Sequence, residues 1–293
     1  MGAHNFKPIL AICLACTIWG LSGIYYDHLS HIPPLEVLAH RALWAMVFLS
    51  TVLLCQKRLY RLFYNTLSIR ELCLLSCSAL MISANWFSFI FAIQTGQAVQ
   101  ASFGYYIFPL VAIILGFLFR GERFSNIQLM AILFAGISVL TLGFALRLIP
   151  SIALIIALTF GAYGLIKGFT KLGSVESVTI ETILIAPLSL SFIGLAYLSN
   201  RNGNYHINNF DLLLLMLSGL ITGGPLILFS YATKKLTYAT VGILQYLNPT
   251  LQFLVAIFVL VEPFNIWHAF ALFFIWVGII IYSGESWRLE SRR

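Results

Sequence analysis

Long stretches without a charged residue recur along nearly the whole chain. A helix needs about 20 apolar residues to cross the roughly 30 Å hydrocarbon core of a bilayer. Charge-free runs of that order lie at 8–26, 124–146, 148–166, 182–200, 212–233, 236–261 and 264–284. Each of these runs predicts one membrane-spanning helix.

Three further spans complete this pattern. The segment between Glu71 and Arg120 is long enough for two helices. Another span fits near 34–55 although it contains charged side chains, and the span at 182–200 starts early enough to include Glu181. The sequence therefore predicts an all-α polytopic membrane protein with ten transmembrane helices.

The two halves of the chain resemble each other. Two stretches match at an offset of about 140 residues. The first contains Ala101–Gly104, Pro109 and Glu122, and the second contains Ala239–Gly242, Pro249 and Glu262. A second match, at an offset of 141, aligns Trp19–Gly23 with Phe160–Gly164. Five spans per half is an odd number, so the halves have opposite orientations in the membrane. We expect two inverted five-helix repeats, 1–146 and 147–293, around a central cavity.

Composition and charge agree with a protein embedded in lipid. Apolar residues make up 60% of the chain and charged residues 9%, far from the values of soluble domains. With the N-terminus in the cytoplasm, fourteen of the seventeen basic residues fall on the cytoplasmic side, as the positive-inside rule requires. Both termini are predicted to be cytoplasmic. The net charge of +7 needs no nucleic-acid partner; the expected partners are the bilayer and a small-molecule substrate, with the oligomeric state open.

Catalytic and metal-binding motifs give little support for an enzyme. Cys13 and Cys16 have the spacing of a metal or redox motif, but inside an apolar helix they fit close helix packing better. The chain has no His-Glu-x-x-His, Gly-x-Ser-x-Gly or Walker motif. We expect neither a metal nor a cofactor, and no enzymatic activity.

Glycine and proline residues interrupt several predicted spans. A break that faces lipid would leave backbone groups without hydrogen bonds, so such breaks occur at packed interfaces or at wet cavities. Paired breaks in inverted repeats indicate a binding site and its hinges. Close packing through small residues is the alternative for each single glycine. The predicted hinge or kink residues are Gly104, Pro109, Pro225, Gly242 and Pro249.

Several ordered motifs resemble one known family. They are Glu36 with His40, Arg41 and Trp44; Asn85-Trp86; Ala101–Tyr105 with Pro109-Leu110; Glu181-Thr182 with Pro187; Thr222–Leu226 with Phe229; Gln245-Tyr246 with Pro249-Thr250; and Phe274–Val277. The sequence resembles the drug/metabolite transporter superfamily, with paired EamA-type repeats, and within it the RarD-type chloramphenicol-sensitivity proteins. The resemblance implies a ten-helix, five-plus-five inverted bundle in the bacterial cytoplasmic (inner) membrane. It implies the movement of small metabolites or drugs, with export as the expected direction, and no particular substrate.

Charged residues within spans are costly and usually face a bundle interior or an aqueous cavity. Glu36 and His40 are four residues apart and share a helix face, and Arg41 follows them. The duplication maps Arg41 onto Glu181 at a different depth, so a direct bridge is disfavoured and the two charges are expected to bracket a central cavity. Arg41 would neutralise a substrate carboxylate or a structural acid, while Glu36, His40 or Glu181 would carry a coupling proton. Snorkelling of Glu36 and Arg41 to the outer interface is the alternative, and Lys167 is expected to snorkel at the cytoplasmic side.

Aromatic and amide side chains near the predicted kinks form a second candidate group. Rings supply stacking surface and amides fix orientation, as in a small-molecule site. The alternative is that the rings belong to interfacial aromatic belts. With Arg41, the residues expected to line the substrate cavity are Asn85, Trp86, Tyr105, Tyr106, Gln245, Tyr246 and Asn248.

The sequence thus favours a secondary transporter that works by alternating access. Inverted repeats with kinked helices are typical of such carriers. The expected substrates are amino-acid-like or amphipathic small molecules. A membrane-embedded enzyme and a passive facilitator or channel without coupling are the alternatives.

Overall fold

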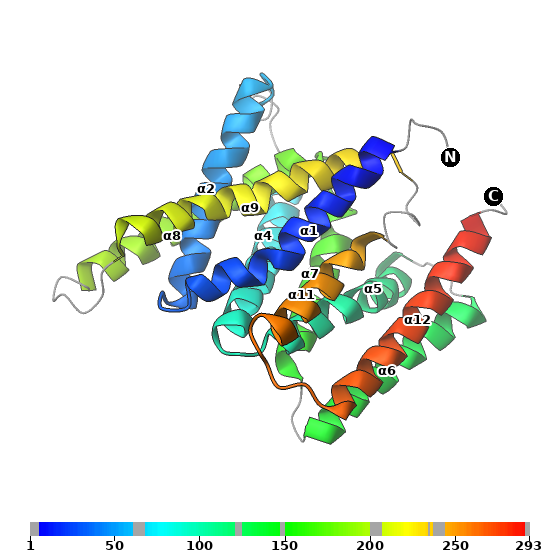
Figure 1. Cartoon of the computed structure of the whole chain (residues 1–293). Helices are drawn as coiled ribbons and strands as arrows, with labels where there is room; N and C mark the ends of the chain where they lie inside the picture. The colour runs from blue at the N-terminus through cyan, green and yellow to red at the C-terminus, as the bar shows by residue number, and fades with distance from the viewer. Residues whose placement is uncertain are drawn as a thin grey trace.

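The described residues of the protein are helical, with no strand among them. A computed structural model describes residues 6–60, 68–120, 125–146, 150–199, 207–233, 235–236 and 244–290. The helices within these ranges are α1 (Phe6–His28), α2 (Pro34–Cys55), α4 (Ile69–Gln94), α5 (Ala98–Arg120), α6 (Asn126–Leu146), α7 (Ser151–Lys167), α8 (Ser174–Ser199), α9 (Asn209–Thr233), α11 (Leu247–Phe258) and α12 (Ile266–Glu290) (Figure 1).

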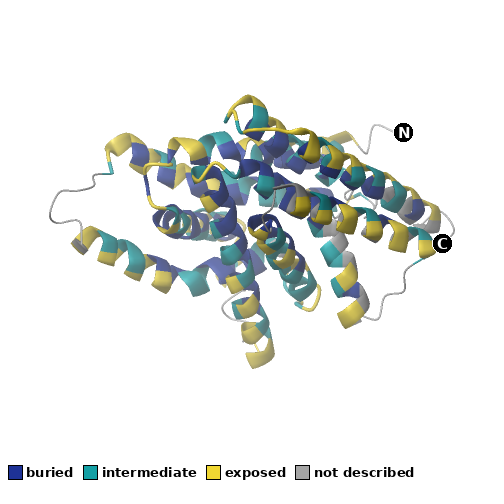
Figure 2. Ribbon diagram, turned by 90° about the horizontal axis from the view of Figure 1, so that it is seen from below, coloured by how far each residue is buried: buried dark blue, intermediate teal, exposed yellow. Residues whose placement is uncertain are grey.

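Five of the described helices are long and apolar enough to cross a membrane. They are α1, α2, α4, residues Val175–Leu198 of α8, and α9. Large apolar side chains such as Leu188 and Phe144 are exposed on the outer faces, and Figure 2 shows exposed residues along the outward sides of the helices. An exterior of this kind suits contact with lipid, so the chain is a multi-pass membrane protein.

Helices from the two halves of the chain pack against one another. α1 contacts α9 and α11, whereas α7 contacts α4 and α5. α2 lies against α8 and α9. α6 and α12 run side by side at one edge of the bundle (Figure 1) and contact the rest of it through α5. The main core is rich in aromatic side chains from α1, α4 and α5, among them Tyr26, Phe89, Phe103 and Tyr106.

Glycines mark two close helix crossings. A Cβ atom added to Gly20 on α1 would lie 2.6 Å from Cβ of Leu251 on α11. A Cβ atom added to Gly161 on α7 would lie 2.8 Å from Cγ1 of Val111 on α5. Both distances are below ordinary carbon contacts, so both crossings require glycine. The duplication aligns Gly20 with Gly161 at the offset of 141 and Val111 with Leu251 at the offset of 140, so the two contacts are equivalent in the two halves.

Gly104 occupies a third close crossing, between α5 and α7. An added Cβ atom would lie 2.8 Å from both the carbonyl oxygen of Ala153 and Cβ of Ile156. We therefore expect Gly104→Ala to lower the free energy of unfolding by about 1–3 kcal/mol through overpacking. SDS-induced unfolding in mixed micelles measures this loss.

Gly164→Ala is the matched control, because beyond the adjacent backbone of its own helix no described atom lies within 4 Å of a Cβ atom added there. Alanine is the better helix former by about 1 kcal/mol, so this variant should be at least as stable as the parent. Equal stability of the two alanine variants would contradict the close crossing at Gly104.

The fourth helix of the second half lies within the expected span at 236–261, of which residues 237–243 fall outside the described part of the chain. Residues 244–245 are helical, Tyr246 forms a turn and α11 begins at Leu247. Pro249 has no N–H to donate to the carbonyl four residues earlier, which interrupts a helix at this point. α11 itself has 12 residues, or roughly 18 Å of length.

Candidate functional site

Arg41 lies in the interior of the bundle. Its side chain projects from α2, and the residue is 6% exposed. Nε donates a hydrogen bond to Oγ1 of Thr222 on α9 at 3.0 Å. The guanidinium carbon lies 4.4 Å from the ring centroid of Trp86 on α4 and 5.3 Å from that of Tyr26 on α1. Three helices thus enclose the cation, which disfavours snorkelling of Arg41 to the interface.

The charge of Arg41 has no protein counter-ion within the described part of the chain. No carboxylate of those residues lies within 4.0 Å of its guanidinium. Contacts with the faces of Trp86 and Tyr26 stabilise the cation through their ring quadrupoles. Aromatic contacts do not neutralise the charge, so Arg41 is a buried cation that can accept an anion.

Glu181 has its own counter-ion. Its carboxylate is fully buried on α8, and Nζ of Lys167 on α7 lies 2.6 Å from Oε1. Ser78 on α4 donates a hydrogen bond to the same oxygen at 2.6 Å, and the Tyr163 hydroxyl lies 3.4 Å from Oε2. Lys167 also donates to Ser177. The pair is therefore a satisfied, buried ion pair across α4, α7 and α8.

The position of Lys167 differs from the sequence-based expectation of snorkelling. The lysine turns into the bundle because Glu181 offers a buried charge, and its ammonium also lies 5.1 Å from the ring of Tyr163. One signal in the sequence could have identified this role. The offset of 141 that aligns the Gly20 and Gly161 regions also aligns Lys167 with Tyr26. Because Tyr26 contacts Arg41, and Arg41 aligns with Glu181, the duplication predicts a contact between Lys167 and Glu181.

Arg41 and Glu181 do not form a bridge with each other. Each has separate partners, as the expected difference in depth suggested. Glu36 and His40 are also buried on α2, and Nε2 of His40 makes no hydrogen bond within the described residues. Within those residues no group of His, Cys, Asp and Glu side chains could hold a metal ion.

Asn85 and its neighbours join α4 to α5 and α7. The Tyr105 hydroxyl donates to Oδ1 of Asn85 at 2.9 Å. Nδ2 of Asn85 donates to the carbonyl of Ile156 at 3.1 Å. Asn85 thus has partners for both its amide oxygen and its amide nitrogen, and these bonds join α4 to α5 and to α7.

The remaining predicted cavity residues lie along α5 and around the start of α11. The hydroxyls of Tyr106 and Thr250 lie 2.9 Å apart, which links these two helices. Asn248 accepts a hydrogen bond from Gln252 at 3.1 Å. Tyr246 is buried and Gln245 half-buried beside the helix break. These side chains are separate from the Arg41 contacts, and no hydrogen bond joins the two groups within the described residues.

The predicted hinge residues have different settings. Gly104 and Pro109 lie within α5, and Pro225 is a buried residue inside α9. Pro249 lies in the first turn of α11, after the break at Tyr246. Gly242 lies outside the described residues.

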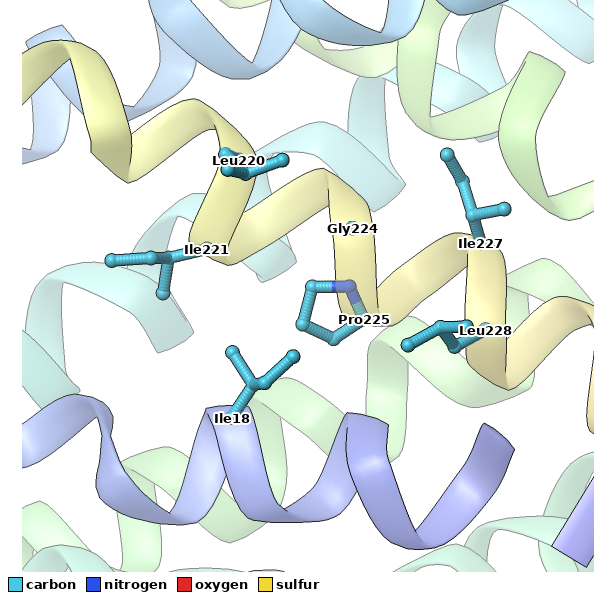
Figure 3. Close-up of a pocket in the computed structure, with 7 residues that line it drawn as sticks. All are labelled: Ile18, Leu220, Ile221, Gly224, Pro225, Ile227 and Leu228. Carbon is cyan, nitrogen blue, oxygen red and sulfur yellow. The ribbon is translucent and has the colours of Figure 1, made fainter. Parts of the chain in front are cut away.

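An apolar cavity of about 440 Å³ lies between α1 and α9. Figure 3 shows Ile18 of α1 facing the bend of α9 at Gly224 and Pro225. The other lining residues are Leu220, Ile221, Ile227 and Leu228. None of these side chains is polar, so the cavity offers no group that fixes the orientation of a ligand. Sequence reasoning identified Pro225 but not this cavity, because its lining resembles any lipid-facing helix surface.

Known proteins resemble this chain over almost its whole length. The model of the EamA-like transporter family matches residues 6–144 and 148–284. The uncharacterized transporter YojE of Bacillus subtilis is 35% identical over 295 residues, which cover 99% of this chain and 98% of that protein. Protein RarD of Escherichia coli is 32% identical over 284 residues, covering 96% and 95%. A solved crystal structure has a TM-score of 0.64 at 16% identity, covering 99% of this chain and 100% of that one, and shows the fold alone.

Proposed function

Because this chain belongs to the EamA-like transporter family, we propose that it is a secondary transporter of small metabolites or drugs that works by alternating access. The family makes it a membrane transporter of the drug and metabolite type. The observation that carries the proposal is the buried Arg41, which three other helices enclose within an apolar bundle. Ionisable residues in such positions mark substrate or ion pathways. The proposed location is the bacterial inner membrane, with net flux outward.

We further propose ten spans arranged as two inverted repeats with cytoplasmic termini. The offsets of 140 and 141 residues support the duplication. The paired crossings of Gly20 with Leu251 and of Gly161 with Val111 support it independently. The distribution of basic residues supports the orientation.

A polar contact before α2 and an ion pair after it support alternating access. Before α2, His31 lies 2.9 Å from Asp211 in the first turn of α9. After α2, Arg58 pairs with Glu176 in the first turn of α8. In the proposed topology these contacts close opposite sides of the membrane. We propose that each pair breaks when its side opens, and that α2 moves relative to α8 and α9 during the cycle.

Counterflow in proteoliposomes tests the proposal. Purified protein is reconstituted and supplied with a labelled panel of amino acids, nucleosides and amphenicol-like drugs, with and without an imposed pH gradient. We expect saturable counterflow of one chemical class. Flux that does not saturate and shows no counterflow would indicate a channel, and chemical conversion of the label would indicate an enzyme. Accumulation that follows the pH gradient would assign a coupling proton, with Glu36, His40 and Glu181 as the residues to replace first.

A further inference from the structure

Arg41 has unused hydrogen-bonding capacity in a setting that fixes its geometry. Thr222 occupies Nε, and the rings of Trp86 and Tyr26 hold the guanidinium from its faces. The two terminal amino groups make no hydrogen bond within the described residues. A guanidinium held in this way presents a planar fork that matches a carboxylate through two parallel hydrogen bonds.

We propose that the substrate is a small organic carboxylate whose anionic group binds the terminal amino groups of Arg41. This inference rests on the proposed transport function and names its substrate class. A substrate carboxylate would supply the counter-charge that the described residues lack at this position. Binding would convert a costly unpaired cation into a hydrogen-bonded ion pair inside the apolar bundle.

The nearby protein acids do not fill this role. Glu181 is engaged by Lys167, Glu176 by Arg58, and Asp211 by His31. Glu36 is on the same helix as Arg41 but five residues earlier, which places the two about 140° apart around the axis. No contact within 4.0 Å joins them. The two charges that the duplication aligns therefore differ: Lys167 neutralises Glu181, whereas no carboxylate in the described part of the chain pairs with Arg41.

A lipid headgroup is a second source of an anion. Arg41 lies only about 10 Å along α2 from the start of that helix at Pro34, within reach of a phosphate that enters the bundle. Its low exposure and its contacts with α1, α4 and α9 favour a ligand inside the bundle over a lipid at the surface. The experiment below separates these two sources.

Matched ligand pairs test the proposal by binding rather than by transport. The ligands are benzoate, phenylacetate and N-acetylalanine, each compared with its neutral amide, and the readout is the ligand-dependent rise in melting temperature. In phosphatidylcholine nanodiscs we expect at least one carboxylate to bind at least about tenfold more tightly than its amide. Arg41→Met should abolish this preference and Arg41→Lys should weaken it. Arg70→Gln, which removes an exposed arginine near the start of α4, should retain it.

Two results would overturn the carboxylate site. One is the absence of any preference for carboxylate over amide, and the other is a preference that survives in Arg41→Met. Phosphatidylglycerol nanodiscs provide the lipid arm. If anionic lipid stabilises the parent but not Arg41→Met, and no carboxylate does so, Arg41 is a lipid site. Carboxylate binding through Arg41 without counterflow of the same compound would retain the site and reject the transporter.

Discussion

Lys167→Met is expected to lower the free energy of unfolding by about 3–5 kcal/mol, because it leaves the carboxylate of Glu181 buried without its cation. Glu181 is fully buried, so its carboxylate has little contact with water to replace the lost ion pair. The remaining hydrogen bond from Ser78 and the distant hydroxyl of Tyr163 do not neutralise the charge. SDS-induced unfolding in mixed micelles measures the loss.

Two variants control this prediction. The double variant Lys167→Met/Glu181→Gln removes both charges, so it should recover most of the stability, since neutral replacement of a buried ion pair is often close to neutral. Lys171→Met makes the same chemical change at an exposed residue and should alter stability by less than about 0.5 kcal/mol. A double variant as unstable as Lys167→Met would contradict the assignment of the pair as a self-contained unit.

Arg41→Met is expected to reduce counterflow by at least about 100-fold while leaving stability within about 1 kcal/mol of the parent. The loss of activity follows from the loss of the charged fork that binds substrate. The small change in stability follows from two opposing effects: the variant loses the contacts with Trp86, Tyr26 and Thr222, and it no longer buries an unpaired cation. Initial counterflow rates and unfolding curves from the same preparation measure both quantities.

The contrast between activity and stability distinguishes this prediction from simple misfolding. Arg70→Gln also removes one positive charge, at an exposed residue of α4, and should leave both quantities unchanged. A large loss of stability in Arg41→Met would show that the arginine holds the bundle together. Full counterflow in a folded Arg41→Met protein would show that the substrate binds elsewhere.

Much of the helical architecture follows from the positions of charged and apolar residues. The expected span at 34–55 coincides with α2, and 212–233 falls within α9. The expected span at 236–261 contains α11, but an uncharged run does not show the turn at Tyr246. The turn at Tyr246 depends partly on the missing N–H of Pro249, which the sequence shows. It also depends on how the surrounding helices pack, which the sequence does not show.

The candidate site was predicted in part. The cost of charge in a bilayer identified Arg41 and Glu181, and the motifs identified Asn85 and Trp86. The partners that give these charges different roles come from other helices. Thr222 contacts Arg41 across 181 residues of sequence, and Ser78 contacts Glu181 across 103. Such pairings depend on how α2 packs on α9 and α4 on α8, and one sequence does not contain that information.

A comparison of Arg41→Met with Lys167→Met/Glu181→Gln in one counterflow assay tests the central claim most directly. The claim is that the aligned charges have separate roles, with the Glu181 pair neutralised within the bundle and Arg41 available to the substrate. The labelled compound is the carboxylate that binds the parent most tightly. We predict that the double variant keeps most of the parent rate while Arg41→Met loses at least about 99% of it. An active Arg41→Met together with an inactive but folded double variant would contradict the claim and place the substrate at Glu181.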